Sequence, residues 1–374
     1  MRTISKAQDS LRLVADGLLF GESPRWRDGA LWVSDWGANE VLRIDDAGQR
    51  EVMARVQSFP MCIEHLLDGR LLIVDSARKR LLRREPDGSL AQHADFDAFS
   101  ELDAFGNDIV VDGRGAIYVN DIGFKFPGGE FRPGVIVLVA PDGAVRKVAD
   151  DLAFPNGMAV TPENKTLIVA ESYACRLTAF DISRDGSLSD RHEWAQVDDH
   201  PDGICLDAAG CAWYADVGNK RCVRVREGGE VLETVELDRG AVACMLGGPE
   251  RRTLFIVCQD WRGAGNWTSG PAPVKSWPSP RRLPQPVGRD PRRYRRTYTR
   301  AFIGGRLGGL LLSPRRAWQS AAASRPPWRR LSPPTRYDEA ILDRLGKLAA
   351  KHGDVLATDP KLRPNSVLRP VAQL

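Results

Sequence analysis

The sequence has few of the residues and patterns that identify common enzyme classes. It contains five histidines in 374 residues, with no H-E-x-x-H spacing and no G-x-S-x-G motif. Zincin metalloproteases and serine hydrolases of the α/β type are therefore not supported. The seven cysteines form no C-x-x-C pair, and an odd number without such pairs indicates reduced thiols rather than a disulfide framework.

Long apolar runs are also missing. The longest, residues 301–312, contains Arg306 and four glycines and is too short to span a bilayer as a helix. Residues 1–10 lack the apolar core of a secretory signal. We therefore expect a cytoplasmic protein without a membrane partner.

Acidic residues are nearly absent from one segment. Residues 262–336 hold sixteen arginines, one lysine and twelve prolines but a single acid, Asp290. The net charge of +4 therefore combines an acidic part, residues 1–261, with the strongly basic segment 262–336. The net charge of the whole chain is thus no evidence for nucleic-acid binding.

The body is rich in turn residues and contains a repeat. Thirty-five glycines and 25 prolines argue against a helical bundle. A turn residue, an alternating apolar strand and an acid recur as DGALWVSD, DGRLLIVD, GRGAIYVND, NKTLIVAE and AGCAWYAD, which end at Asp35, Asp75, Asp121, Glu171 and Asp216; a weaker copy, RRTLFIVC, ends at Cys258. Because each terminal acid recurs by position, we interpret these acids as structural.

The repeat spacing of 40 to 50 residues is typical of one four-stranded propeller blade per repeat. We therefore predict an all-β fold, a six-bladed β-propeller over residues 1–261. Its last blade could be incomplete, and we expect residues 11–16 to join the strands near residues 242–246 and 253–258. Such a strand would link the two ends of the propeller.

Polar side chains stand where the innermost strand of several blades should begin. The six positions, in chain order, are Glu22, Met61 or Cys62, Asn107, Asn156, Asp202 and Cys244. Four of them offer oxygen ligands, and burying such groups is costly unless they are hydrated or bound to a cation. Their convergence on one axis would indicate a cation site.

Structural interpretations of these residues remain open. Pro-Asn-Gly and Pro-Asp-Gly are turn-forming tripeptides, and Glu22 alone is an ordinary solvated acid. Asn107 is either a substrate contact or a strand cap. Asp108 is a weaker candidate for extending the site. Cys62 and Cys244 are interpreted as small buried apolar residues.

The motifs GESPRW, FPNGMAVTPENKTLIVAES and HPDGICLDAAGCAWYAD resemble the senescence-marker-protein, gluconolactonase and luciferin-regenerating-enzyme family of regucalcin-like propellers. The resemblance covers roughly residues 12–261. It implies a divalent cation held by Glu22, Asn156 and Asp202, with Asn107 near the substrate. The family's gluconolactonases often carry an arginine at the position of Phe105, so this departure weakens the case for an aldonolactone as substrate.

Oxygen ligands favour Ca²⁺, with Mg²⁺, Mn²⁺ and Zn²⁺ as alternatives. The function that we predict is metal-dependent hydrolysis of a small lactone, a gluconolactonase-like carboxylic ester hydrolysis, in which the resemblance implies Asp202 as both ligand and catalytic base. The alternative is a noncatalytic propeller that binds Ca²⁺ or a protein partner. A third interpretation, nucleic-acid binding through the arginine-rich segment, is weaker.

The segment 262–336 has the composition of a disordered region or of a shifted reading frame in GC-rich coding sequence. A genuine basic arm is the rival interpretation. In the last segment, 337–374, residues 337–353 have the pattern of a short amphipathic helix, with acids at the start and Lys351-His352-Gly353 at the end.

Overall fold

The structure is a computed structural model that describes residues 11–198, 200–260 and 299–305. Its contacts divide the chain into two units, and residues 125–130, a short turn segment, belong to the second. All described strands and helices lie in the first unit. The expectations for residues 262–298 and 306–374, including the C-terminal helix, lie outside the described residues.

Five sheets are antiparallel and have four strands each, which follow one another in chain order. We call them blades 1 to 5. Blade 1 contains β2 (Gly21–Arg27), β3 (Ala30–Asp35), β4 (Glu40–Ile44) and β5 (Arg50–Arg55). Blade 2 contains β6 (Ile63–His65), β7 (Leu71–Asp75), β8 (Arg80–Arg84) and β9 (Leu90–Asp95). Blade 3 contains β10 (Asp108–Val111), β11 (Ile117–Asp121), β12 (Gly134–Val139) and β13 (Val145–Leu152).

Blades 4 and 5 repeat this order. Blade 4 contains β14 (Pro155–Val160), β15 (Thr166–Glu171), β16 (Arg176–Ile182) and β17 (Leu188–Gln196). Blade 5 contains β18 (Pro201–Leu206), β19 (Ala212–Asp216), β20 (Arg221–Val225) and β21 (Val231–Glu236). The helices among the described residues are 3-10 turns: η2 (Ser76–Arg78), η3 (Asp97–Phe99), η4 (Ser172–Ala174) and η5 (Pro249–Arg251). None of the helices in this part of the chain could cross a membrane.

A further sheet joins distant parts of the chain, and we call it the mixed sheet. Its strand order is β1 (Leu11–Asp16), β24 (Thr299–Gly305), β23 (Thr253–Gln259) and β22 (Gly240–Gly247). Strand β24 is parallel to both of its neighbours, whereas β22 and β23 are antiparallel. Strand β1 has the predicted bounds, but it pairs with β24 and does not join β23 directly. Residues 299–305, which lie within the segment 262–336, form β24.

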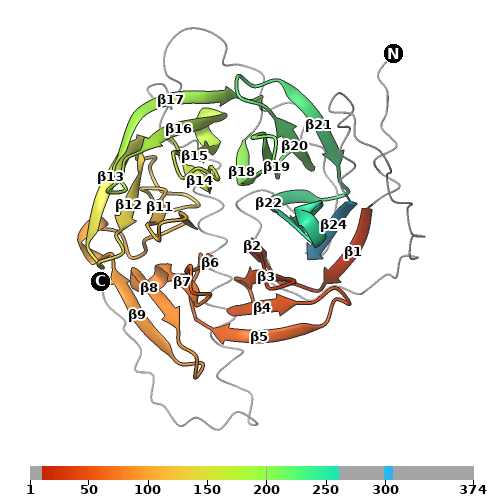
Figure 1. Ribbon diagram of the computed structural model, residues 1–374, viewed down its shortest axis with the longest axis horizontal. Helices are drawn as coiled ribbons and strands as arrows, with labels where there is room; N and C mark the ends of the chain where they lie inside the picture. Colours follow the sequence, from red (N-terminus) through yellow and green to blue (C-terminus); the bar gives the residue numbers. More distant parts are fainter. Residues whose placement is uncertain (1–10, 199, 261–298, 306–374) are drawn as a thin grey trace. The chain divides into compact units, whose positions relative to one another are not determined.

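The first strand of each blade lies at the centre of the arrangement (Figure 1). The pairs in contact are β2 and β6, β6 and β10, β10 and β14, β14 and β18, β18 and β22, and β22 and β2. These contacts form a closed cycle, so side chains at the starts of different inner strands can share one central space.

The hydrophobic core lies between neighbouring sheets. One buried cluster combines Leu72 and Val74 of blade 2 with Val119 and Val137 of blade 3. Similar clusters occur at the other sheet interfaces, including those of the mixed sheet with blades 5 and 1. The strands of the repeated sequence pattern are buried on both faces because each is covered by a neighbouring sheet, and each buried aliphatic side chain contributes about 1.5–3 kcal/mol.

The predicted all-β propeller is confirmed. The repeated strands end at the residues expected from the sequence: β3 at Asp35, β7 at Asp75, β11 at Asp121, β15 at Glu171 and β19 at Asp216. The weaker sixth copy forms β23. The pattern is informative because a turn glycine followed by an apolar strand is a local signal.

Candidate functional site

The candidate site residues lie at the starts of inner strands. Glu22, Asn156 and Asp202 are the second residues of β2, β14 and β18, and Asn107 directly precedes β10. All four side chains are partly exposed, whereas the residues beside them are mostly buried. In β14 and β18 the tripeptides Pro-Asn-Gly and Pro-Asp-Gly are extended, so the turn interpretation of these two tripeptides is wrong.

The three proposed ligand positions share one backbone irregularity. Pairing shifts register between Glu22 and Arg25 in β2, between Pro155 and Met158 in β14, and between Pro201 and Ile204 in β18. Such irregularities re-aim side chains that a regular strand would point across the sheet. This feature gives Glu22, Asn156 and Asp202 equivalent local surroundings.

Glycine allows the inner strands of blades 4 and 5 to approach closely. A Cβ on Gly157 would lie 2.7 Å from the Asp202 carbonyl oxygen and 2.5 Å from the Ile204 nitrogen. These separations are too short for any side chain, so Gly157 is required for this packing. The same close approach brings the neighbouring Asn156 beside Asp202.

Side-chain contacts connect the predicted site residues. The Asn107 Nδ2 lies 3.4 Å from the Asn156 Oδ1, and the Asn156 side chain is close enough to the Asp202 carboxyl to oppose the rise of its pKa. The Glu22 carboxylate is close enough to act electrostatically on Asp202. The structure therefore brings all four predicted side chains into one neighbourhood.

Two carboxyl groups share this neighbourhood with little positive charge to stabilise their ionised forms. Burial raises the pKa of both Glu22 and Asp202 above the usual carboxyl range, and the charge of Glu22 raises the pKa of Asp202 further. The positive charge of Arg25 lowers the pKa of Glu22 only slightly. The Arg25 guanidinium is already paired with Glu64 at 2.7 Å and with Asp108 at 3.2 Å. A cation would restore the balance.

The donor set fits a divalent cation. Two carboxylates would compensate its charge, and the amide oxygen of Asn156, with only a long contact to Asn107, keeps a lone pair for a metal. Among the described residues, no group of three His, Cys, Asp or Glu side chains is placed to hold a metal. The candidate site would instead use two carboxylates, those of Glu22 and Asp202, together with the amide oxygen of Asn156, so it does not contain three side chains of these four types.

The terminal acids position the segments that lead into the site. Asp35 accepts a hydrogen bond from the Phe20 nitrogen at 2.8 Å, and Asp121 accepts one from the Gly106 nitrogen at 2.9 Å. Glu171 accepts one from the Ala153 nitrogen at 2.7 Å. All five terminal acids are buried, which confirms their structural interpretation. Three of them fix the backbone one to three residues before a predicted site residue.

Sequence reasoning missed Ser172 and Arg25. The Ser172 Oγ accepts a hydrogen bond from the Asn156 Nδ2 at 3.3 Å and donates one to the Pro201 oxygen at 2.7 Å, so it links two inner strands. Arg25 belongs to the GESPRW motif, but only the fold brings it to Glu64 of blade 2 and to blade 3. No local signal marks such contacts between blades.

Other candidates have structural surroundings. Asp108 binds the Arg25 guanidinium and accepts a hydrogen bond from the Met158 nitrogen at 2.8 Å, so it connects blades. Phe105 is fully buried and packs against Phe96 with ring centroids 5.1 Å apart. Cys62 and Cys244 are buried, as expected. Position 105 therefore supplies no charged group to the site.

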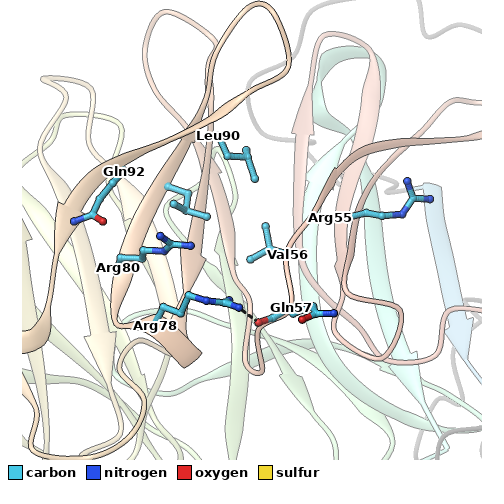
Figure 2. A pocket seen from close by; sticks show the side chains of 8 residues that line it. Arg55, Val56, Gln57, Arg78, Arg80, Leu90 and Gln92 are labelled. Atoms are coloured by element: carbon cyan, nitrogen blue, oxygen red, sulfur yellow. Dashed lines mark hydrogen bonds between the residues drawn. The ribbon is translucent and has the colours of Figure 1, made fainter. Parts of the chain in front are cut away.

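A pocket of about 300 Å³ lies elsewhere, between the outer strands of blades 1 and 2 (Figure 2). Its arginines already have acidic partners: Arg78 and Arg80 pair with Asp75, and Arg55 pairs with Glu40. None of the predicted site residues lines it, so we treat it as separate from the candidate site.

Comparison with known families tests the resemblance that the GESPRW, Pro-Asn-Gly and Pro-Asp-Gly motifs suggested. The family model described as "SMP-30/Gluconolactonase/LRE-like region" matches residues 20–259. The chain belongs to this family. The match spans the five blades and the antiparallel pair of the mixed sheet, and it includes all four predicted site residues.

Individual members are distant in sequence. Regucalcin from Xenopus laevis is 26% identical over 272 residues, which cover 67% of this chain and 88% of that protein. The 6-deoxy-6-sulfogluconolactonase of Pseudomonas putida is 24% identical, with coverage of 64% and 83%. The structure of a gluconolactonase from Xanthomonas campestris gives a TM-score of 0.58 at 27% identity, with coverage of 66% and 85%. These relatives support lactonase chemistry at the level of the family.

Proposed function

We propose that this protein is a metal-dependent hydrolase that opens a small lactone. The observation that carries the proposal is the arrangement of Glu22, Asn156 and Asp202, which come from three separate blades and share one neighbourhood that lacks balancing positive charge. Membership of a family that contains gluconolactonases supports the same reaction class.

Glu22, Asn156 and Asp202 would hold the cation, and Ca²⁺ is the ion that we favour because all the donors are oxygens. Mg²⁺, Mn²⁺ and Zn²⁺ are the alternatives. When bound, the cation supplies Lewis-acid polarisation of the lactone carbonyl.

The protein's own groups orient the reactants and move the proton. Asp202 accepts a proton from water as the water oxygen bonds to the carbonyl carbon. The ring C–O bond then breaks, and the proton passes to the departing alkoxide, which yields the open hydroxy acid. The Asn107 Nδ2 donates to the Pro155 oxygen at 3.2 Å and points to the Asn156 Oδ1 at 3.4 Å, so the Asn107 Oδ1 would accept a hydrogen bond from a substrate hydroxyl.

We further propose that the mixed sheet is the sixth blade of this propeller. The closed cycle of inner-strand contacts and the buried clusters on both sides of the mixed sheet support this. Residues 1–261 would then supply all of the propeller except β24. A reducing, cytoplasmic location is supported by the odd number of cysteines, seven, and by the absence of C-x-x-C pairs from the sequence.

The test is a panel of lactones assayed with the full-length protein. Chelation should abolish turnover and an added divalent ion should restore it, and Asp202→Ala should remove the activity. Glu230→Ala, which changes a surface acid on the outer side of blade 5, serves as the control. Turnover that survives chelation or the Asp202 substitution would contradict the proposal.

The same assay separates the alternative function. A noncatalytic propeller would bind Ca²⁺ through the same oxygen donors but turn over no lactone in the panel. The regucalcin relatives make this the second candidate to be tested.

A further inference from the structure

Four aromatic rings gather beside the candidate site, and we call them the aromatic wall: Phe124, Phe131, Phe154 and Tyr173. The centroids of Phe154 and Tyr173 are 4.8 Å apart, and those of Phe131 and Tyr173 are 5.8 Å apart. The rings come from segments that flank β11, β12, β14 and β15, so blades 3 and 4 both contribute.

Backbone hydrogen bonds fix this wall at the edge of blade 4 where Asn156 lies. The Tyr173 nitrogen donates to the Ala153 oxygen at 3.1 Å, and the Ser172 nitrogen donates to the Phe154 oxygen at 3.0 Å. Because the Ser172 Oγ accepts a hydrogen bond from the Asn156 side chain, Tyr173 is one residue away from a direct partner of the site.

Tyr173 leaves part of its ring uncovered. Its exposed fraction is 39%, and its hydroxyl has no hydrogen-bond partner within the part of the chain that the structure describes. An aromatic ring anchored on one side by three other rings and open on the other offers a rigid apolar contact surface with one polar atom.

A second aromatic group lies at the edge of blade 1 where β2 begins, next to Glu22. Phe20 stacks on Trp36 at 5.1 Å, and Trp36 contacts Phe59 edge-on at 5.2 Å. The exposed fraction of Phe59 is 48%. Aromatic surface is therefore available beside two of the three proposed ligands.

We propose that the site takes a lactone with an aryl or alkyl substituent, which packs on the aromatic wall, in preference to a polyhydroxylated lactone. This inference rests on the proposed lactonase function. Burial of an apolar substituent against Tyr173 is favourable, whereas hydroxyl groups placed against the rings would lose hydrogen bonds to water.

The first test compares kcat/KM for dihydrocoumarin and δ-gluconolactone, with full-length protein supplied with a divalent ion. The wild type should favour dihydrocoumarin at least tenfold. Tyr173→Ala should lower this preference about tenfold, mainly through KM for dihydrocoumarin, and Tyr173→Phe should retain it. Leu67→Ala, in the turn that follows β6 with an exposed fraction of 59%, is the control and should leave both values unchanged.

The second test measures binding without turnover. The lactam analogue of dihydrocoumarin should bind the wild-type protein at least tenfold more tightly than it binds Tyr173→Ala in calorimetric titration, with melting temperatures used to confirm that the variant is folded. Equal affinities, or a wild-type preference for δ-gluconolactone, would overturn the inference. Absence of turnover for every lactone would instead contradict the proposed function, and the lactam titration would still decide the role of the wall.

Discussion

Gly157 is the residue on which the geometry of the site depends most directly. It has no room for a Cβ, because the Asp202 carbonyl oxygen and the Ile204 nitrogen are within 2.7 Å of that position. A side chain there would push β14 away from β18 and separate Asn156 from Asp202.

We therefore expect Gly157→Ala to weaken cation binding at least tenfold and to lower the free energy of unfolding by about 1–3 kcal/mol. Calorimetric titration with Ca²⁺ and urea denaturation measure the two effects. Gly218→Ala is the matched control, since its Cβ would meet only an Asp216 oxygen at 3.7 Å. Equal effects of the two substitutions would contradict this account of Gly157.

His65 gives the folded protein a specific sensitivity to acid. Burial, together with the positive charges of Arg27 and Arg25, lowers the pKa of His65 to about 4. The Nε2 atom is buried without a hydrogen-bond partner among the described residues, and the ring lies edge-on to Trp32 at 4.8 Å. Glu64, 4.0 Å away, does not compensate for these effects.

The unfolded chain therefore binds more protons at this residue between about pH 6.5 and 4, and stability falls as the pH drops through this window. Between pH 7 and 4.5 the wild type should lose about 2 kcal/mol more unfolding free energy than His65→Gln. Urea denaturation at both values measures this. Parallel losses would show that His65 is protonated in the folded protein.

At the scale of the element, each repeated strand ends in an acid that holds a neighbouring segment. Glu171 has four partners: the Ala153 nitrogen, the Thr178 hydroxyl, Arg176 and Arg191. Although burial opposes ionisation, these partners hold the pKa of Glu171 below its usual range.

Glu171→Ala should lower the free energy of unfolding by about 3 kcal/mol, because it leaves the buried Thr178 hydroxyl and the Ala153 nitrogen without an acceptor and removes the charged partner of two arginines. Glu230→Ala removes an exposed pair with Arg226, separated by 3.2 Å, and should change stability by no more than about 0.5 kcal/mol. Denaturant titration of both variants provides the comparison. Similar effects for the two acids would contradict the structural role of Glu171.

The sequence predicted the elements well where the signal was local. The strand ends at Asp35, Asp75 and Asp121 follow from a turn residue, an apolar strand and an acid, and they are confirmed. The register shifts that surround Asn156 and Asp202 could not be predicted, because Pro-Asn-Gly and Pro-Asp-Gly favour turns in isolation. Packing of Gly157 against the next inner strand overrides that preference.

At the scale of the whole molecule, the sequence did not predict which distant strands pair with one another. Strand β24 pairs in parallel with β1 and β23, although the composition of residues 262–336 indicated no strand. Composition averages over a segment, whereas the apolar residues Ala301, Phe302 and Ile303 form a short local exception. Parallel pairing across large sequence separations leaves no spacing signal in the chain.

The central claim at this scale is that one divalent cation joins three blades through Glu22, Asn156 and Asp202. The most direct measurement is calorimetric titration of the metal-free, full-length protein with Ca²⁺. We predict one ion per chain and at least tenfold weaker binding for Glu22→Gln and for Asp202→Asn, with Glu230→Gln unchanged. Absence of binding by the wild type, or equal affinity in all four proteins, would contradict the claim.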